Sequence, residues 1–398
     1  MTGTDTSAAG EERWLLPEGI EELLPEQAAR VECLRRDLLD LYGRWGYELV
    51  IPPLMEFTDS LLIGLGKDLD LQTFTLTDQL SGRLLGIRPD ITAQAARIDA
   101  HSLRREGPVR LCYAGSVLHT RRRSPFASRS PIQLGAELYG DASAAADLEI
   151  ISLMLETMCR LGVRDVTLDL GHVGIFRALM QDLALDAAVQ DAVFEALQHK
   201  SVPRIAAIVA EAGLDAARAG LLCRLAGLNG GREVIDRAAQ LFAGAAPSAC
   251  APLAALADVA DKIAARMPGV TLHFDLCELQ GYHYHTGLVF AAYVPGQGEA
   301  IANGGRYDDI GRVFGRARPA TGFSFDLKTL LGLLPATAAA PRRGVFVDHA
   351  LADAAWTEIQ RLREGGERVL LGLPGQQGSA CCDRELRRAA DAWHIHTV

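Results

Sequence analysis

Two histidines alternate with tyrosines in the stretch LQGYHYHTGLVF, Leu279 to Phe290. Alternate side chains of a strand share a face, so His283 and His285 could act as metal ligands, as acid–base groups, or as ordinary strand residues. A metal site needs three or four ligands with groups that orient them, and no nearby Cys, Asp or Glu completes an obvious set. We therefore expect no metal site, and we expect no cofactor.

A carboxylate and a hydroxyl stand two residues apart in RPDIT, Arg88 to Thr92, at an expected strand-to-helix turn. Asp90 and Thr92 could together hold an ammonium group. The ordinary alternative is that Asp90 only caps the following helix, and the local residues favour this cap.

A third candidate is the expected strand PIQLGAELYG, in which Gln133, Gly135 and Glu137 share one face. The opposite face, with Leu134 and Ala136, is apolar and should pack. A glycine between an amide and a carboxylate leaves space in which a small ligand could lie. The alternative is a solvated strand face with a glycine irregularity.

Two further motifs are weaker. The run Arg121 to Arg123 in LHTRRR could clamp a phosphate, although a solvated basic loop is the commoner role of such a run. In ANGGRYDDI the paired glycines allow a turn or a close approach of the backbone.

Length and composition limit the classes of protein. The chain has 398 residues, a net charge of -10 and eight scattered cysteines. The acidic balance argues against a general nucleic-acid binder, and no apolar run is long enough for a membrane span. No CxxC pair suggests a zinc site, and reduced thiols in a cytoplasmic protein are the default expectation for such cysteines.

The elements that must position these residues indicate an α+β fold with a mostly antiparallel sheet flanked by helices. LPEQAARVECLRRDLLDLYGRWG, Leu24 to Gly46, predicts an amphipathic helix opened by Pro25. TFTLTDQLSGRLLGIRPD predicts a hairpin, and a helix should follow from about Ser143 to Leu161.

The organisation along the chain predicts four parts. Residues 1–14 should form a loose tail, and residues 15–173 with 268–335 should form the core. Residues 174–267 are rich in Ala and Leu, show no clear strand and predict a helical insertion. After a linker, residues 341–398 predict a short α/β region made of a strand, a helix, a strand and a last helix.

In this order, six stretches resemble the catalytic core of histidyl-tRNA synthetase, a class II aminoacyl-tRNA synthetase. The resemblance covers about Leu15 to Leu334 and rests on GYELVIPPLMEF, RPDIT, GSVLHTRRRSPFASRSPIQLGAELYG, GYHYHTGLVF, ANGGRYDDI and GFSFDLKTLL. It implies the class II antiparallel sheet, and a first motif that supports a dimer.

Three arginines that the synthetases use on ATP and the adenylate are missing. The matching positions hold His119 in the second motif, Thr329 in the third motif and Gln280 before the tyrosine signature. The resemblance therefore implies a degenerate ATP site.

The amino-acid side of the pocket is better kept. The residues that fall where the family holds histidine are Asp90, Thr92, Gln133, Glu137, Tyr284, His285 and Tyr307. Asp90 is shorter than the family's glutamate, and His285 replaces its second tyrosine. The C-terminal region is too short for the family's anticodon-binding domain, so we expect no tRNA substrate.

A synthetase-like core with these losses is similar to the regulatory subunits of short-form ATP phosphoribosyltransferase. This resemblance implies a non-catalytic partner of the catalytic subunit in the first step of histidine biosynthesis. It also implies a dimer core within a hetero-oligomer and L-histidine as a possible effector. The alternatives are a histidyl-tRNA synthetase, an amino-acid-activating relative without tRNA, or a metal-binding regulator that uses His283 and His285.

Overall fold

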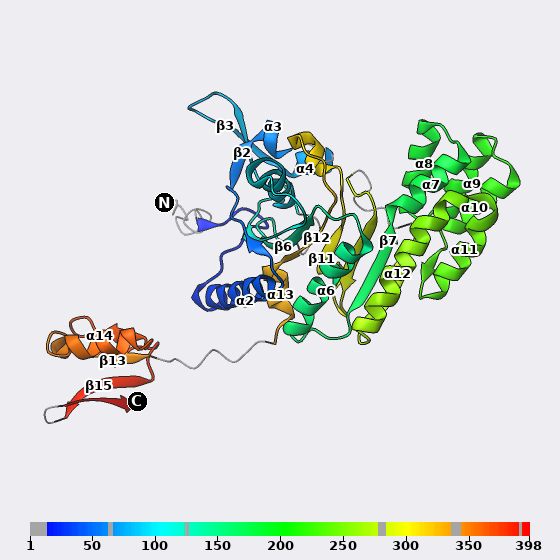
Figure 1. Cartoon of the computed structure of the whole chain (residues 1–398). Helices are drawn as coiled ribbons and strands as arrows, with labels where there is room; N and C mark the ends of the chain where they lie inside the picture. The colour runs from blue at the N-terminus through cyan, green and yellow to red at the C-terminus, as the bar shows by residue number, and fades with distance from the viewer. Residues whose placement is uncertain are drawn as a thin grey trace, which may run out of the picture. The chain divides into compact units, whose positions relative to one another are not determined.

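The protein is described from a computed structural model (Figure 1), which forms two compact units, Met1–Leu334 and Pro335–Val398. The structure describes residues 14–62, 67–122, 124, 127–277, 284–335, 344–389 and 392–398. Most of the expected N-terminal tail, Arg123, Gln280 and His283 therefore lie outside the described residues. No helix of the described part is long and apolar enough to cross a membrane.

The first unit is built on one large sheet, which has nine strands within the described residues, in the order β1-β5-β6-β12-β11-β10-β7-β9-β8. Its central strands, from β5 to β7, pair antiparallel, whereas β1 with β5 and β7 with β9 pair parallel. The strands span Glu48–Leu49 (β1), Val109–Ser116 (β5), Ile132–Tyr139 (β6), Thr167–His172 (β7), Asn229–Gly230 (β8), Thr271–Asp275 (β9), Leu288–Tyr293 (β10), Ala302–Arg306 (β11) and Ala320–Asp326 (β12). The predicted α+β class with a mostly antiparallel sheet is confirmed.

Helices cover one face of this sheet. The predicted first helix is present as α2 (Pro25–Arg44), which packs with α6 (Ala144–Arg160) and α13 (Leu327–Leu333) (Figure 1). The helix α12 (Cys250–Arg266) packs against α6 in turn. The side chains of Leu134 and Ala136 on β6 are fully buried in this layer. The apolar face predicted for β6 is therefore confirmed, and it leaves the other face for the polar residues.

A small sheet with the order β2-β4-β3 leads into the candidate site. Its strands are β2 (Met55–Phe57), β3 (Phe74–Thr77) and β4 (Leu84–Ile87), so the predicted hairpin is confirmed. The neighbouring helical segments are α3 (Thr58–Leu61), α4 (Lys67–Gln72), α5 (Thr92–Arg97), the π-helix η2 (Ile98–Leu103) and the 3₁₀-helix η4 (Ile310–Phe314).

Residues after β7 form a bundle of helices beside the sheet (Figure 1). Its members are α7 (Val173–Leu183), α8 (Ala187–Gln198), α9 (Val202–Glu211), α10 (Ala216–Leu225), α11 (Glu233–Ala245), the 3₁₀-helix η3 (Pro247–Ala249) and α12. The expectation of no strand here was wrong, because Asn229–Gly230 pairs with β9 and extends the large sheet.

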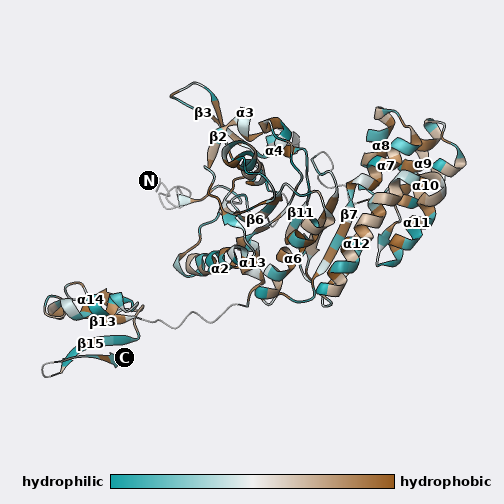
Figure 2. Ribbon diagram, in the orientation of Figure 1, coloured by the Kyte–Doolittle hydropathy of each residue, from teal (hydrophilic) through white to brown (hydrophobic). Residues whose placement is uncertain are grey.

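The second unit has a four-stranded sheet with the order β14-β13-β15-β16. Its elements are β13 (Val345–Val347), η5 (His349–Leu351), α14 (Trp356–Glu364), β14 (Val369–Leu371), β15 (Arg384–Ala389) and β16 (Ala392–Thr397). The predicted last helix was wrong, because β15 and β16 form an antiparallel hairpin. This hairpin is largely hydrophilic (Figure 2), and Leu386 is its buried residue in the small core. Pairing with β13 overrides the helix propensity of the Arg- and Ala-rich segment.

Candidate functional site

The segment between β4 and α5 is held by a buried arginine. Arg88 donates from Nε to the carbonyl oxygen of Ser116 at 2.9 Å, and from Nη1 to that of Pro52 at 2.8 Å. Its backbone nitrogen donates to Leu54 and its carbonyl oxygen accepts from Leu118. The segment that carries the candidate carboxylate therefore has little freedom to move.

Asp90 takes part in two hydrogen bonds at the start of α5. One carboxylate oxygen accepts from the backbone nitrogen of Thr92 at 2.6 Å, and the other accepts from Gln133 Nε2 at 2.9 Å. The Gln133 side-chain oxygen accepts from the backbone nitrogen of Ile91 at 2.9 Å. Asp90 therefore stabilises the turn before the helix, and it also faces the polar side of β6.

Glu137 lies at the centre of the site and is 1% exposed. Tyr113 donates to Glu137 Oε1 at 2.9 Å, Tyr307 bonds to Oε2, and the Tyr113 hydroxyl is 3.2 Å from Thr92 Oγ1. The polar face of β6 is thus buried, so the alternative of a solvated strand face was wrong. We call these side chains the Glu137 network, and its members are Asp90, Thr92, Tyr113, Gln133, Glu137 and Tyr307.

Burial governs the charge of this network. It raises the pKa of Glu137 to about 8, although hydrogen bonds from Tyr307 and Tyr113 favour the ionised form and oppose the shift. Burial and the neighbouring carboxylate also raise the pKa of Tyr113 and of Tyr307. The network is therefore a compact set of neutral or singly charged oxygens that can accept hydrogen bonds from a ligand's N–H groups.

Tyr113 is the member of the network that the sequence analysis missed. It pairs with Gly135 across β5 and β6, and its ring lies where a Gly135 side chain would be. The space beside Gly135 is thus filled by Tyr113 and is not open to a ligand, contrary to expectation. The alternation of β5 was the available signal, but without the strand register it does not place Tyr113 opposite Gly135.

Tyr284 and His285 of the histidine signature are described, and His285 lies beside Gly305 of β11. His285 is 7% exposed and Tyr284 is 38% exposed, with their ring centroids 4.2 Å apart. An added Cβ at Gly305 would lie 2.7 Å from His285 Nε2, so this glycine allows the close approach of the imidazole. Arg177 of α7 donates to the His285 carbonyl oxygen at 2.7 Å and links the helical bundle to this segment.

Two of the three degenerate positions are described. His119 is 3% exposed, and its Nε2 lies 2.9 Å from the carbonyl oxygen of Pro89. Thr329 is exposed, and its hydroxyl bonds to Asp326. His119 is thus a buried side chain that bonds to the Asp90 segment, while Gln280 lies outside the described residues.

Metal ligation by His283 and His285 is one of the alternatives that the sequence leaves open. In the part of the chain that the structure describes, no group of three or more His, Cys, Asp and Glu side chains could hold a metal ion. His283 is not among the described residues, so the pair with His285 stays untested.

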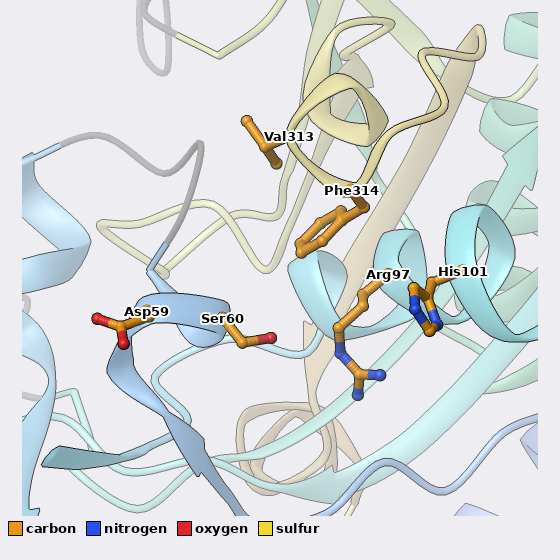
Figure 3. Close-up of a pocket in the computed structure, with 6 residues that line it drawn as sticks. All are labelled: Asp59, Ser60, Arg97, His101, Val313 and Phe314. Carbon is orange, nitrogen blue, oxygen red and sulfur yellow. The ribbon is translucent and has the colours of Figure 1, made fainter. Parts of the chain in front are cut away.

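A separate surface pocket of about 500 Å³ lies between α3, η2 and η4 (Figure 3). It is lined by Asp59, Ser60, Arg97, His101, Val313 and Phe314. The guanidinium of Arg97 is paired with Glu56 at 2.5 Å, which neutralises its charge. None of the residues predicted for the site lines this pocket.

Comparison with protein families divides the chain at the same linker. Residues 19–330 match the model of the histidyl-tRNA synthetase family. Residues 342–396 match the model of the ATP phosphoribosyltransferase subunit HisZ C-terminal domain.

Two curated relatives match nearly the whole chain. An ATP phosphoribosyltransferase regulatory subunit from Azotobacter vinelandii is 54% identical over 388 residues, which cover 96% of this chain and 98% of the relative. The regulatory subunit from Pseudomonas aeruginosa is 53% identical over the same share of both chains.

Solved structures agree with this fold. An ATP phosphoribosyltransferase regulatory subunit/histidyl-tRNA synthetase from Bacillus halodurans has a TM-score of 0.80 and 29% identity, and covers 92% of this chain and 94% of its own. The histidyl-tRNA synthetase of a Nostoc species, at 17% identity and a TM-score of 0.76, shares the fold. With a synthetase-like core, a HisZ-type C-terminal unit and near full-length identity above half, the chain belongs to the family of ATP phosphoribosyltransferase regulatory subunits.

Proposed function

We propose that this chain binds and activates the catalytic subunit of ATP phosphoribosyltransferase in the cytoplasm, and makes it sensitive to L-histidine bound at the Glu137 network. In this proposal it neither activates an amino acid nor takes tRNA as a substrate. The observation that carries the proposal is the complete hydrogen-bonded Glu137 network beside motif positions that lack the phosphate arginines.

The chemistry of the network suits free histidine. An imidazole N–H can donate to Glu137, and the ammonium group can donate to Asp90 and Thr92. The Gln133 amide donates to the Asp90 carboxylate. Asp90 therefore lies on the same side of the sheet as Gln133. His285 and Tyr284 would then cover the imidazole. Such a site binds an amino acid without needing a nucleotide.

The same motif positions argue against adenylate formation. Loss of one preorganised donor for developing charge typically costs about 3 kcal/mol, or a hundred- to a thousandfold in rate. His119 is buried against Pro89 and cannot replace an arginine that binds phosphate. Thr329 bears no charge. We therefore propose that aminoacylation is lost.

Activation of the partner tests the proposal directly. When the purified chain is mixed with the catalytic subunit, the initial rate of phosphoribosyl transfer from PRPP to ATP should rise, because the complex forms the active enzyme. Histidine should then lower the rate, with a coupling of roughly 5- to 150-fold, typical of allosteric sites. A rate that is unchanged by this chain contradicts the proposal.

A pocket variant separates histidine sensing from assembly. Glu137→Ala should weaken inhibition by histidine and leave co-purification with the catalytic subunit intact. Glu195→Ala, on the exposed surface of α8, removes one carboxylate away from the network and serves as the control. Equal losses of inhibition and assembly would show that Glu137 has a structural role only.

Stability should depend on pH through Glu137. Burial raises the pKa of Glu137 from its ordinary value of 4.5 to about 8 in the folded chain. Between these values the unfolded chain releases a proton that the folded chain keeps, so this group lowers the free energy of unfolding as pH rises. Glu137→Gln has no such penalty, and its advantage over the wild type should grow from pH 5 to pH 8 by at most about 1.4 kcal/mol per pH unit.

Urea denaturation at the two pH values measures this difference. The control is Glu195→Ala, whose difference from the wild type should stay constant between pH 5 and pH 8. A Glu137→Gln advantage of the same size at both values would show that the carboxyl is ionised in the folded chain at low pH.

We also propose that two copies associate through the exposed apolar segment around β1. Leu49, Ile51 and Leu54 are 48%, 85% and 49% exposed, and β1 is the edge strand of the large sheet. Large apolar side chains gathered at a sheet edge mark an interaction surface.

A charge placed in this segment should disrupt the dimer. Ile51→Glu would bury a carboxylate in the interface, and we expect the dissociation constant to rise by about a hundredfold or more, equivalent to about 2.7 kcal/mol. Sedimentation velocity over a concentration series measures it. Val202→Glu, at a 44% exposed position on α9, is the control and should sediment like the wild type. A dimer that survives Ile51→Glu places the interface elsewhere.

A further inference from the structure

An N-terminal segment before α2 packs against the basic loop between β5 and β6. We call residues 17–24 the strap. The backbone nitrogen of Arg129 donates to the Gly19 carbonyl oxygen at 2.8 Å, and Arg129 Nη1 donates to that of Glu18 at 2.9 Å. Gly19 has a φ of +76°, and an added Cβ would lie 2.7 Å from Arg122 Nε. Glycine is therefore needed here, because the strap backbone lies directly against two arginines.

The strap also places a carboxylate among cationic and hydroxyl donors. Glu21 Oε1 accepts from Lys328 Nζ at 2.7 Å and from Ser128 Oγ at 2.6 Å. Lys328 Nζ also donates to Ser130 Oγ at 3.2 Å. These donors come from two segments far apart in the sequence, the basic loop and the first turn of α13.

The charges around Glu21 indicate an anion site. The side chain of Lys328 is only 14% exposed, so its ammonium group needs a counter-charge. Burial alone would raise the pKa of Glu21, but hydrogen bonds from Lys328 and Ser128, with the charge of Arg122, lower it below its usual value. The carboxylate is therefore ionised and acts as the anion of this cluster.

We propose that Glu21 is an internal ligand of an anion site made by Lys328, Ser128 and Ser130, and that it keeps polyphosphates from binding there. A carboxylate and a phosphate accept the same charge-assisted hydrogen bonds, so either can occupy one set of donors. In this proposal the basic loop between β5 and β6 contains arginines but does not bind phosphorylated substrates. This inference does not depend on histidine binding.

Inorganic pyrophosphate is the probe, titrated into the full-length chain by calorimetry at low ionic strength. The variants are Glu21→Ala, Glu21→Gln, Glu22→Ala, and Glu21→Ala combined with Lys328→Ala. Glu22 is exposed and adjacent, so Glu22→Ala makes the same change in net charge outside the site. Glu21→Gln keeps a hydrogen-bond acceptor without the charge, and serves if Glu21→Ala does not fold.

We expect pyrophosphate to bind Glu21→Ala at least tenfold more tightly than it binds the wild type or Glu22→Ala. Glu21→Gln should also gain affinity, and the Lys328→Ala combination should lose the gain. Higher salt should weaken the gain, because exposed charges are screened. Equal affinities for the wild type and both Glu21 variants would overturn the proposal, as would a gain that survives Lys328→Ala.

Discussion

The site depends on a carboxyl group that is buried in the middle of a large sheet. No salt bridge reaches Glu137 within the described part of the chain, and its oxygens bond to two tyrosine hydroxyls. An isolated buried charge costs several kcal/mol, so the neutral form is favoured and the pKa rises to about 8. Burying such a group does not stabilise the fold. This is the reason for our proposal that Glu137 binds a ligand.

Hydrogen bonds from several elements hold the segment beside the network. The segment that carries Asp90 is fixed by Arg88, by Gln133 and by His119. The resemblance to the synthetases implies a phosphate-binding arginine at the position of His119, and we propose that His119 instead supports the Asp90 segment. The strap adds the carboxylate of Glu21, which accepts a hydrogen bond from Lys328.

Much of the fold followed from periodicity in the sequence. The alternation in PIQLGAELYG correctly assigned Leu134 and Ala136 to the packed face, and Gln133 and Glu137 to the other. The predictions that were wrong or missing depend on contacts between residues that are distant in the sequence. Tyr113 fills the space beside Gly135 only because the β5–β6 register places it there. The resemblance matched His119 to an arginine position of the synthetases, but nothing in the sequence predicted its hydrogen bond to the Pro89 carbonyl oxygen. The prediction of a last helix was wrong because the pairing of β15 with β13 overrides the local helix propensity.

The central claim is that this chain keeps a histidine pocket without the chemistry of histidine activation. The most direct measurement is calorimetric titration of the purified chain with L-histidine, followed on the same sample by histidine-dependent exchange of pyrophosphate into ATP. We predict saturable binding of about one histidine per chain and no exchange above background. Exchange above background, or no binding by a chain shown to be folded, would contradict the account.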